Sequence, residues 1–229
     1  MIPTQVGDVD EVKRLLCSEG VNKDCVLGDS DSTPLCEAVA WGHRAVVQAL
    51  LDGGADLHKA DRKGWTPLDW AVRVGSKCAV QLLLDGGAEP NRAREDGETA
   101  LGTAVELGFK DVAKLLLKGG ADPNKSGRHG YTPLHRAAAS GRREVVQLLL
   151  ERGADPGKTD EQAKTPLAHA RENGHFDIVN YVNILSPTSW NNSSVIKKII
   201  RKNCNDVAHV ENEQEDMEEA LARLAEERV

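Results

Sequence analysis

The sequence predicts an all-α solenoid of stacked helix-turn-helix units, followed by a C-terminal helical extension. Three observations support this fold class: an internal repeat with a 33-residue period, apolar residues at helical spacing within each period, and glycines at fixed positions between them. One such unit cannot bury its own apolar face. Several stacked units form a continuous core in which each unit touches only its neighbours.

Each repeat begins with a threonine that is followed two positions later by a leucine. The motif recurs every 33 residues, as Thr33-Pro34-Leu35, Thr66-Pro67-Leu68, Thr99-Ala100-Leu101, Thr132-Pro133-Leu134 and Thr165-Pro166-Leu167. A threonine side chain can cap a helix by accepting a hydrogen bond from a free backbone N–H, and proline suits the first helical position. The motif therefore predicts the start of a short first helix in every unit.

A glycine lies nine residues after each of these threonines, where the first helix is expected to end. The glycines are Gly42, Gly75, Gly108, Gly141 and Gly174. Because glycine adopts a positive φ at no steric cost, it can turn the chain back into a second helix. An apolar run such as residues 79–84 then gives the second helix its buried face.

The repeat resembles the ankyrin family. Residues 132–137 match the family signature Thr-Pro-Leu-His-x-Ala closely, whereas the other units depart from it at the His position, which is Cys36, Asp69, Gly102 or Ala168. The resemblance covers about residues 5–185. It implies paired antiparallel helices with projecting β-hairpin loops, and a His135 that forms hydrogen bonds within the scaffold.

The repeat register divides the chain into ankyrin repeats and flanking segments. Five repeats are expected at about 28–60, 61–93, 94–126, 127–159 and 160–185, after a truncated N-terminal unit at 1–27. The short start indicates an atypical cap, a fragment or a short isoform. Residues 186–194 have the composition of a linker.

Residues 195–229 are expected to form a helical and acidic tail. Its basic stretch, 195–202, either caps the last repeat or contacts a partner. Its acidic stretch, 211–228, forms either a solvated tail or a helix that docks on a partner or on the basic segment.

Charge and composition exclude several functional classes. Nine acidic and two basic residues lie between Asp206 and Val229, whereas the preceding residues are neutral overall, which argues against a nucleic-acid-binding surface. No apolar stretch approaches the roughly 20 residues that cross a bilayer, and the start lacks a signal-peptide pattern. Five cysteines without a C-x-x-C pair predict reduced thiols. We therefore expect a cytoplasmic or nuclear protein, monomeric by itself, that binds neither nucleic acid nor a membrane.

The sequence contains none of the catalytic motifs G-x-S-x-G, H-E-x-x-H or a Walker-type glycine loop. The histidines show no metal-ligand spacing, so we expect no enzyme activity, no cofactor and no metal. The favoured function is a scaffold or adaptor that binds a protein or peptide. The alternative is an inhibitor or regulatory subunit of an enzyme that uses the acidic C-terminal segment.

Side chains that the fold does not require point to the binding surface. In ankyrin repeats, partner contacts commonly come from the hairpin tips and the exposed side of the first helix, and Trp, Tyr and Arg often dominate binding energy. The candidates on this concave surface are Trp41, Trp65, Trp70, Arg128, Tyr131 and Arg136. The alternative is that the rings pack against neighbouring hairpins and stiffen the array.

The expected hairpins alternate in charge from one repeat to the next. The sequence places acidic Asp29 and Asp31, then basic Arg62 and Lys63, then acidic Glu95, Asp96 and Glu98, then basic Arg128. This alternation favours a protein or peptide of mixed charge over a polyanion, the alternative being a solvated loop edge.

Two asparagines, Asn91 and Asn124, follow Glu89-Pro90 and Asp122-Pro123. The resemblance implies that asparagine at this position can be hydroxylated. The simpler interpretation is that each side chain caps the turn between two repeats.

Overall fold

The structure, a computed structural model, describes residues 8–16, 22–24 and 32–185. The chain divides into two compact units, 1–179 and 180–229. The linker and tail expected at 186–194 and 195–229 lie outside the described residues, as does most of the N-terminal unit expected at 1–27.

Helices follow one another in pairs along the described part of the chain. The first helices are α3 (Pro34–Ala40), α5 (Pro67–Arg73), α7 (Ala100–Leu107), α9 (Pro133–Ala139) and α11 (Pro166–Glu172). The second helices are α4 (Arg44–Asp52), α6 (Lys77–Asp85), α8 (Lys110–Lys118), α10 (Arg143–Glu151) and α12 (Phe176–Leu185). A further helix, α2 (Val9–Leu16), precedes them and packs against α4. None of the described helices has the length and apolar composition needed to span a membrane.

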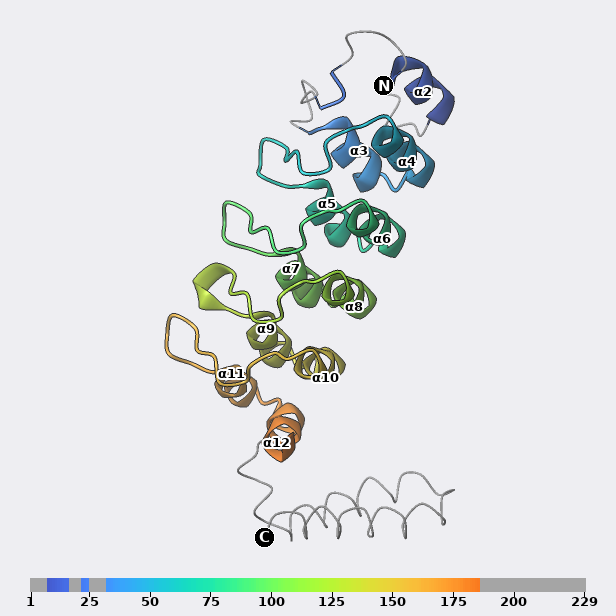
Figure 1. Cartoon of the computed structure of the whole chain (residues 1–229). Coiled ribbons are helices and arrows are strands. Elements are labelled where there is room, and N and C mark those ends of the chain that lie inside the picture. Colours follow the sequence, from blue (N-terminus) through green and yellow to red (C-terminus); the bar gives the residue numbers. More distant parts are fainter. Residues whose placement is uncertain (1–7, 17–21, 25–31, 186–229) are drawn as a thin grey trace, which may run out of the picture. The chain divides into compact units, whose positions relative to one another are not determined.

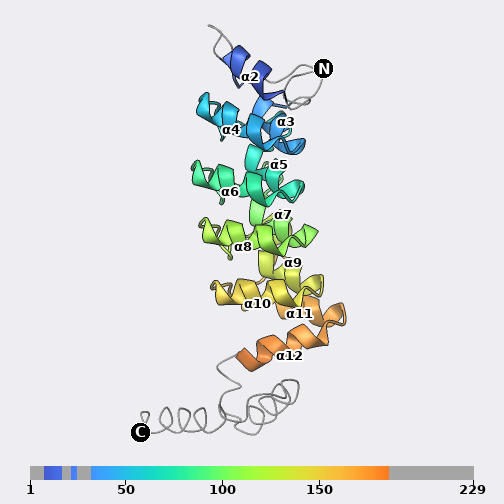
Figure 2. The same cartoon turned by 90° about the vertical axis from the view of Figure 1, so that its right-hand side faces the viewer.

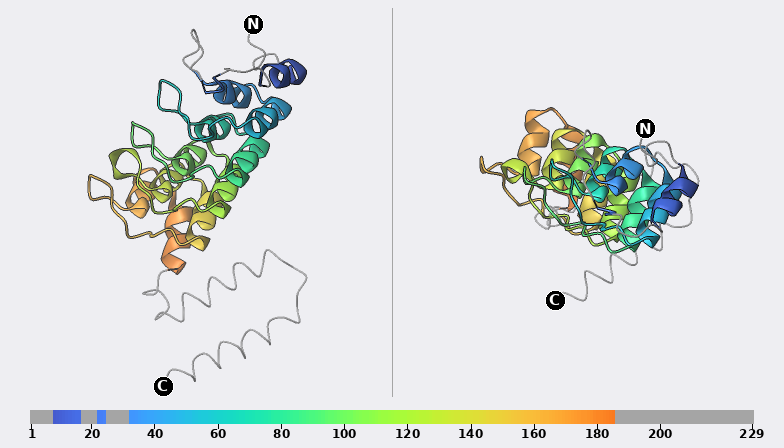
Figure 3. Two further views of the ribbon diagram at one scale, coloured as in Figure 1. Left: turned by 45° about the horizontal axis from the view of Figure 1, so that its top comes forward. Right: turned by 90° about the horizontal axis from the view of Figure 1, so that it is seen from above.

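The helix pairs stack in register. First helices form one column and second helices form another beside it (Figures 1 and 2). Within the columns α5 packs on α3 and α7, and α6 packs on α4 and α8. The loops between successive repeats project from the same side of the stack (Figure 3). The predicted all-α solenoid of helix-turn-helix units is confirmed.

The aliphatic core follows the repeat. Leu35, Leu68, Leu101 and Leu134 are at most 3% exposed, whereas Leu167 in the last pair is partly exposed. Burying one leucine side chain stabilises a fold by about 1.5–3 kcal/mol. The repeated Thr-x-Leu motif therefore places one strong apolar anchor in each of the first four pairs.

Each first helix begins at the predicted threonine. The Thr132 side chain accepts a hydrogen bond from the backbone N–H of His135, and the other four threonines cap their helices in the same way. In return, Nδ1 of His135 lies 3.1 Å from the backbone nitrogen of Thr132, and its Nε2 lies 3.0 Å from the carbonyl oxygen of Lys164. The predicted scaffold role of His135 is confirmed. Burial lowers the pKa of His135 because the charged imidazole loses hydration.

The turn within each pair requires glycine for two reasons. Gly75, Gly108 and Gly141 have φ values of +68°, +81° and +69°, a region in which other residues are strained. In addition, a side chain from the next repeat lies where a Cβ atom would project. These side chains are Phe109 at Gly75, Arg142 at Gly108 and His175 at Gly141.

The loops between repeats are narrow and closed at their base by a backbone hydrogen bond. The backbone N–H of Asp61 donates to the carbonyl oxygen of Trp65 at 2.9 Å, and equivalent bonds close the next three loops. Ala93 and Thr99 form an isolated antiparallel bridge, and no described residue lies in an extended strand. The projecting hairpins are therefore tight loops in the described part of the chain.

The asparagine side chains between repeats connect one repeat to the next. The amide oxygen of Asn91 accepts the backbone N–H of Asp122 at 2.7 Å, and its amide nitrogen donates to the carbonyl oxygen of Gly120 at 2.8 Å. Asn124 makes the same two contacts with the following repeat. Both contacts match the expectation that these asparagines cap turns between repeats.

Candidate partner-binding surface

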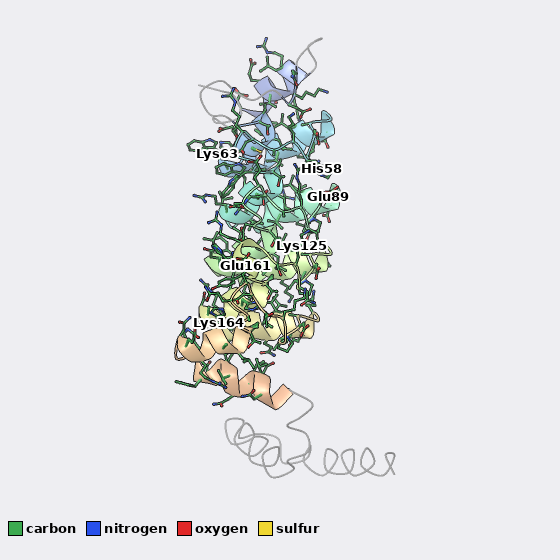
Figure 4. All side chains as sticks on the ribbon, turned by 90° about the vertical axis from the view of Figure 1, so that its left-hand side faces the viewer. His58, Lys63, Glu89, Lys125, Glu161 and Lys164 are labelled. Carbon is green, nitrogen blue, oxygen red and sulfur yellow. The ribbon has the colours of Figure 1, made fainter. Side chains whose placement is uncertain are left out.

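The loop side of the stack carries charged side chains of both signs. Figure 4 looks onto this side and shows residues from successive loops in two rows. Lys63, Glu161 and Lys164 lie toward one edge, and His58, Glu89 and Lys125 lie toward the other. The surface beside these loops contains the candidate residues.

Trp65 is half-buried at the base of the loop before α5, and its ring lies near two guanidinium groups. Cζ of Arg73, at the end of α5, is 4.9 Å from the ring centroid, and Cζ of Arg94, from the next loop, is 4.4 Å away. A guanidinium over an indole ring contributes about 0.5–1 kcal/mol at an exposed site. Two repeats therefore fix the position of this ring.

A hollow of about 260 Å³ opens beside Trp65. Its wall also contains Leu107 and Thr103 of α7. The remaining lining residues are charged: Arg73, Arg94, Arg128 and Arg136, with Asp96, Glu98 and Glu106. The hollow thus combines an aromatic ring, an exposed leucine and charges of both signs.

Glu98 is 5% exposed, although the sequence analysis placed it among the hairpin charges. Its Oε1 accepts the backbone N–H of Thr99 at 3.1 Å, and its Oε2 pairs with Arg136 of the next repeat. A Cβ atom on Gly102 would overlap with this Oε1 atom, so the missing side chain leaves room for the carboxylate. Glu98 therefore takes over the capping role that the third helix residue has in other repeats.

Arg136 is enclosed by acidic groups. It pairs with Glu98 and, at 2.7 Å, with Glu106 of α7, and only 14% of its side chain is exposed. A hydrogen bond to a charged group contributes about 1.5–3 kcal/mol to stability. Arg136 thus holds its repeat against the preceding one, which limits its availability to a partner.

Tyr131 packs within a cluster of rings. Its ring centroid is 5.7 Å from that of His135, in a parallel arrangement, and 5.1 Å from that of His169. His169 Nε2 in turn lies 2.7 Å from Oδ2 of the buried Asp160. Burial opposes ionisation of Asp160, but hydrogen bonds from His169 and from two backbone N–H groups outweigh it and lower the pKa of Asp160 to about 2.

Trp70 and Trp41 differ in accessibility. The Trp70 ring lies 5.3 Å from that of Trp65, and its indole N–H donates to Oδ2 of Asp61 at 3.0 Å. Trp41 follows the last residue of α3 and is 60% exposed, with its indole N–H donating to Glu37 at 3.0 Å. Trp70 therefore stiffens the base of its loop, whereas the Trp41 ring faces solvent.

Trp41 is the first member of an apolar row. Val74 and Leu107 occupy the same repeat position at the ends of α5 and α7, and they are 43% and 45% exposed. The first helices pack on one another in register, so these three side chains follow one another along the stack. The equivalent residues in the last two repeats are Ser140 and Asn173, where the apolar row ends.

The structure brings three of the six candidates, Trp65, Arg128 and Arg136, to one hollow. The other three do not line it. Sequence reasoning missed Arg73 and Arg94, although both follow from the register. Arg94 stands 33 residues after Asp61 at the loop base, and Arg73 stands one helical turn after Trp70.

A family model for ankyrin repeats, comprising three copies, matches residues 1–94 and 75–160. No curated protein matches the chain. The matched residues cover more than half of the sequence and coincide with the stacked helix pairs. The chain belongs to the ankyrin-repeat family.

Proposed function

We propose that the chain is a scaffold or adaptor that binds a protein or peptide on the surface formed by its first helices and loops. Ankyrin repeats generally mediate protein–protein interaction. The observation that carries the proposal is the apolar row of Trp41, Val74 and Leu107, which meets the hollow beside Trp65 at Leu107. Neighbouring exposed apolar side chains with a polar rim are typical of interaction sites.

The six candidate residues have two roles within this proposal. Three are accessible and would contact the partner: Trp41, Trp65 and Arg128. Three are held by contacts within the stack and would position the loops: Trp70, Tyr131 and Arg136. The aromatic residues would therefore both stiffen the array and contact the partner, which combines the two interpretations of the sequence.

The alternative function, an inhibitor or regulatory subunit, depends on the acidic C-terminal segment. That segment lies outside the described residues. The apolar row favours the scaffold, because it offers a binding surface within the repeats themselves.

Site-specific photocrosslinking tests the scaffold proposal. Benzoylphenylalanine replaces Leu107 in the apolar row or, as the control, the exposed Cys78 of α6. In an extract of the source cells, position 107 is expected to capture a discrete partner that position 78 does not capture. Trp41→Ala and Trp65→Ala should each weaken binding of that partner by about 30-fold, the effect of a hot spot of about 2 kcal/mol. Equal capture at both positions, or unchanged affinity in both variants, would contradict the proposal.

A further inference from the structure

We infer that the hollow beside Trp65 receives an acidic side chain of the partner, adjacent to an apolar side chain that packs on Leu107. The partner segment is then an acidic peptide with an apolar anchor. This inference rests on the proposed scaffold function and specifies the chemistry that its binding surface recognises.

The first step concerns charges that are already neutralised inside the wall of the hollow. Glu98 and Glu106 both pair with Arg136, and Glu98 is also held by the backbone N–H of Thr99. Because these contacts use one arginine for two carboxylates, neither acid is left for the other arginines. Arg136 and its two carboxylates therefore form a closed group within the wall.

The second step concerns the arginines that share the remaining carboxylate. Nε and Nη2 of Arg94 lie 3.3 and 3.4 Å from the two Asp96 carboxylate oxygens. Arg128 reaches Asp96 only at 3.7 Å, and its side chain is 57% exposed. Within the described part of the chain, Arg73 has no carboxylate within ion-pair distance, and its guanidinium contacts the Trp65 ring. Arg73 and Arg128 are therefore poorly neutralised groups on the wall of one hollow.

The third step places this positive charge beside the apolar row. Leu107 lines the hollow, and Val74 directly follows Arg73 at the end of α5. A carboxylate that enters the hollow gains charge-assisted hydrogen bonds from guanidinium groups, and a neighbouring apolar side chain buries exposed surface on Leu107. Charge complementarity thus selects an acidic segment, and the apolar row selects a polypeptide with apolar side chains.

A nucleic acid fits this surface less well. Its phosphates would meet Asp96 and Glu106 on the wall of the hollow, and its backbone would leave Leu107 and Val74 without apolar contacts. The overall charge of −7 also opposes a polyanion at long range.

Selection from a displayed library of random 16-residue peptides against the full chain tests the inference. We expect the enriched peptides to carry Asp or Glu next to Leu, Ile or Phe. Replacing that acid by Gln or Asn in a synthetic peptide should weaken binding about tenfold or more, and added salt should weaken it as well. The double variant Arg73→Gln/Arg128→Gln should show the same loss in fluorescence anisotropy, with an unchanged circular dichroism spectrum.

Arg152→Gln provides the matched control, because Arg152 is an exposed arginine at the end of α10, outside the lining of the hollow. This variant should bind like the wild type. Enriched peptides without acids, equal binding to the double variant, or no enrichment at all would each overturn the inference. A cellular partner that crosslinks at position 107 but binds independently of Arg73 and Arg128 would overturn acid recognition and leave the scaffold proposal intact. Failure to capture any partner at position 107 would remove both.

Discussion

Replacing Gly102 by alanine is expected to destabilise the protein, although alanine is the better helix former. Gly102 lies inside α7, where alanine normally stabilises a helix by about 1 kcal/mol relative to glycine. Here the new Cβ atom would overlap with Oε1 of Glu98 and would lie 3.2 Å from Oγ1 of Thr99. The Glu98 carboxylate must therefore leave its place in the wall of the hollow.

The expected loss follows from the contacts that Glu98 makes. Its carboxylate would give up the backbone N–H of Thr99 and the pairing with Arg136, whose side chain is 14% exposed. Breaking a buried ion pair on one side costs about 3–5 kcal/mol. Arg136 keeps Glu106, so the lower end of this range applies. After subtracting the gain in helix propensity, the net destabilisation is about 2 kcal/mol.

Urea unfolding followed by circular dichroism measures this difference, and a double-mutant cycle with Glu98→Ala isolates its cause. Once the carboxylate is absent, the same Gly102→Ala substitution should stabilise the protein by about 0.5–1 kcal/mol. The sign of the effect therefore inverts between the two backgrounds. Stabilisation by Gly102→Ala in the wild-type background would refute the assignment of Glu98 as the residue that requires this glycine.

Three further predictions concern titratable groups. The lowered pKa of His135 favours the folded state fully above about pH 6.5, and this contribution is lost as the pH falls through the folded-state pKa. The urea midpoint should therefore drop between pH 7 and pH 5, and it should drop less in His135→Asn; an identical drop in both proteins would contradict this. Asp160, with its pKa lowered to about 2, stabilises the fold above pH 3.8 and loses this effect as the pH falls toward 2. The melting temperature of Asp160→Asn should be below that of the wild type at pH 7, with the gap closing near pH 2; a constant gap would count against this assignment. Burial raises the pKa of Cys36 to about 12, so iodoacetamide should modify Cys36 only after unfolding, while the exposed Cys78 reacts in the native protein. Peptide mass spectrometry distinguishes the two sites, and native labelling of Cys36 would disprove its protection.

The helix boundaries could be predicted because their signals are local in sequence. Thr132 caps α9 by bonding to a residue three positions later, and Gly108 has the positive φ that its place after α7 suggests. Both features depend on side chains and torsions within one turn. The 33-residue period then carried the same assignment through the whole array.

The surroundings of Trp65 and Glu98 could not be predicted in this way, because they arise between repeats. Trp65 meets Arg94 from the following loop, and Glu98 turns inward because Gly102 leaves space and Arg136 supplies the opposite charge. The sequence presents Glu98 as one more charged loop residue. Only the stacking distance between repeats decides that this carboxylate is buried.

The pairing of Glu98 with Arg136 has a consequence for how such an array can change. If the unit containing α7 and α8 were copied in tandem, the residue facing the first copy of Glu98 would be Thr103, which stands 33 residues before Arg136. The buried carboxylate would then lose its counter-charge at the new junction. Phe109, in contrast, would meet Gly108 much as it meets Gly75 in the present order. Duplication at this junction is thus compatible with the shape of the turn but not with its electrostatics, so these units are not interchangeable modules.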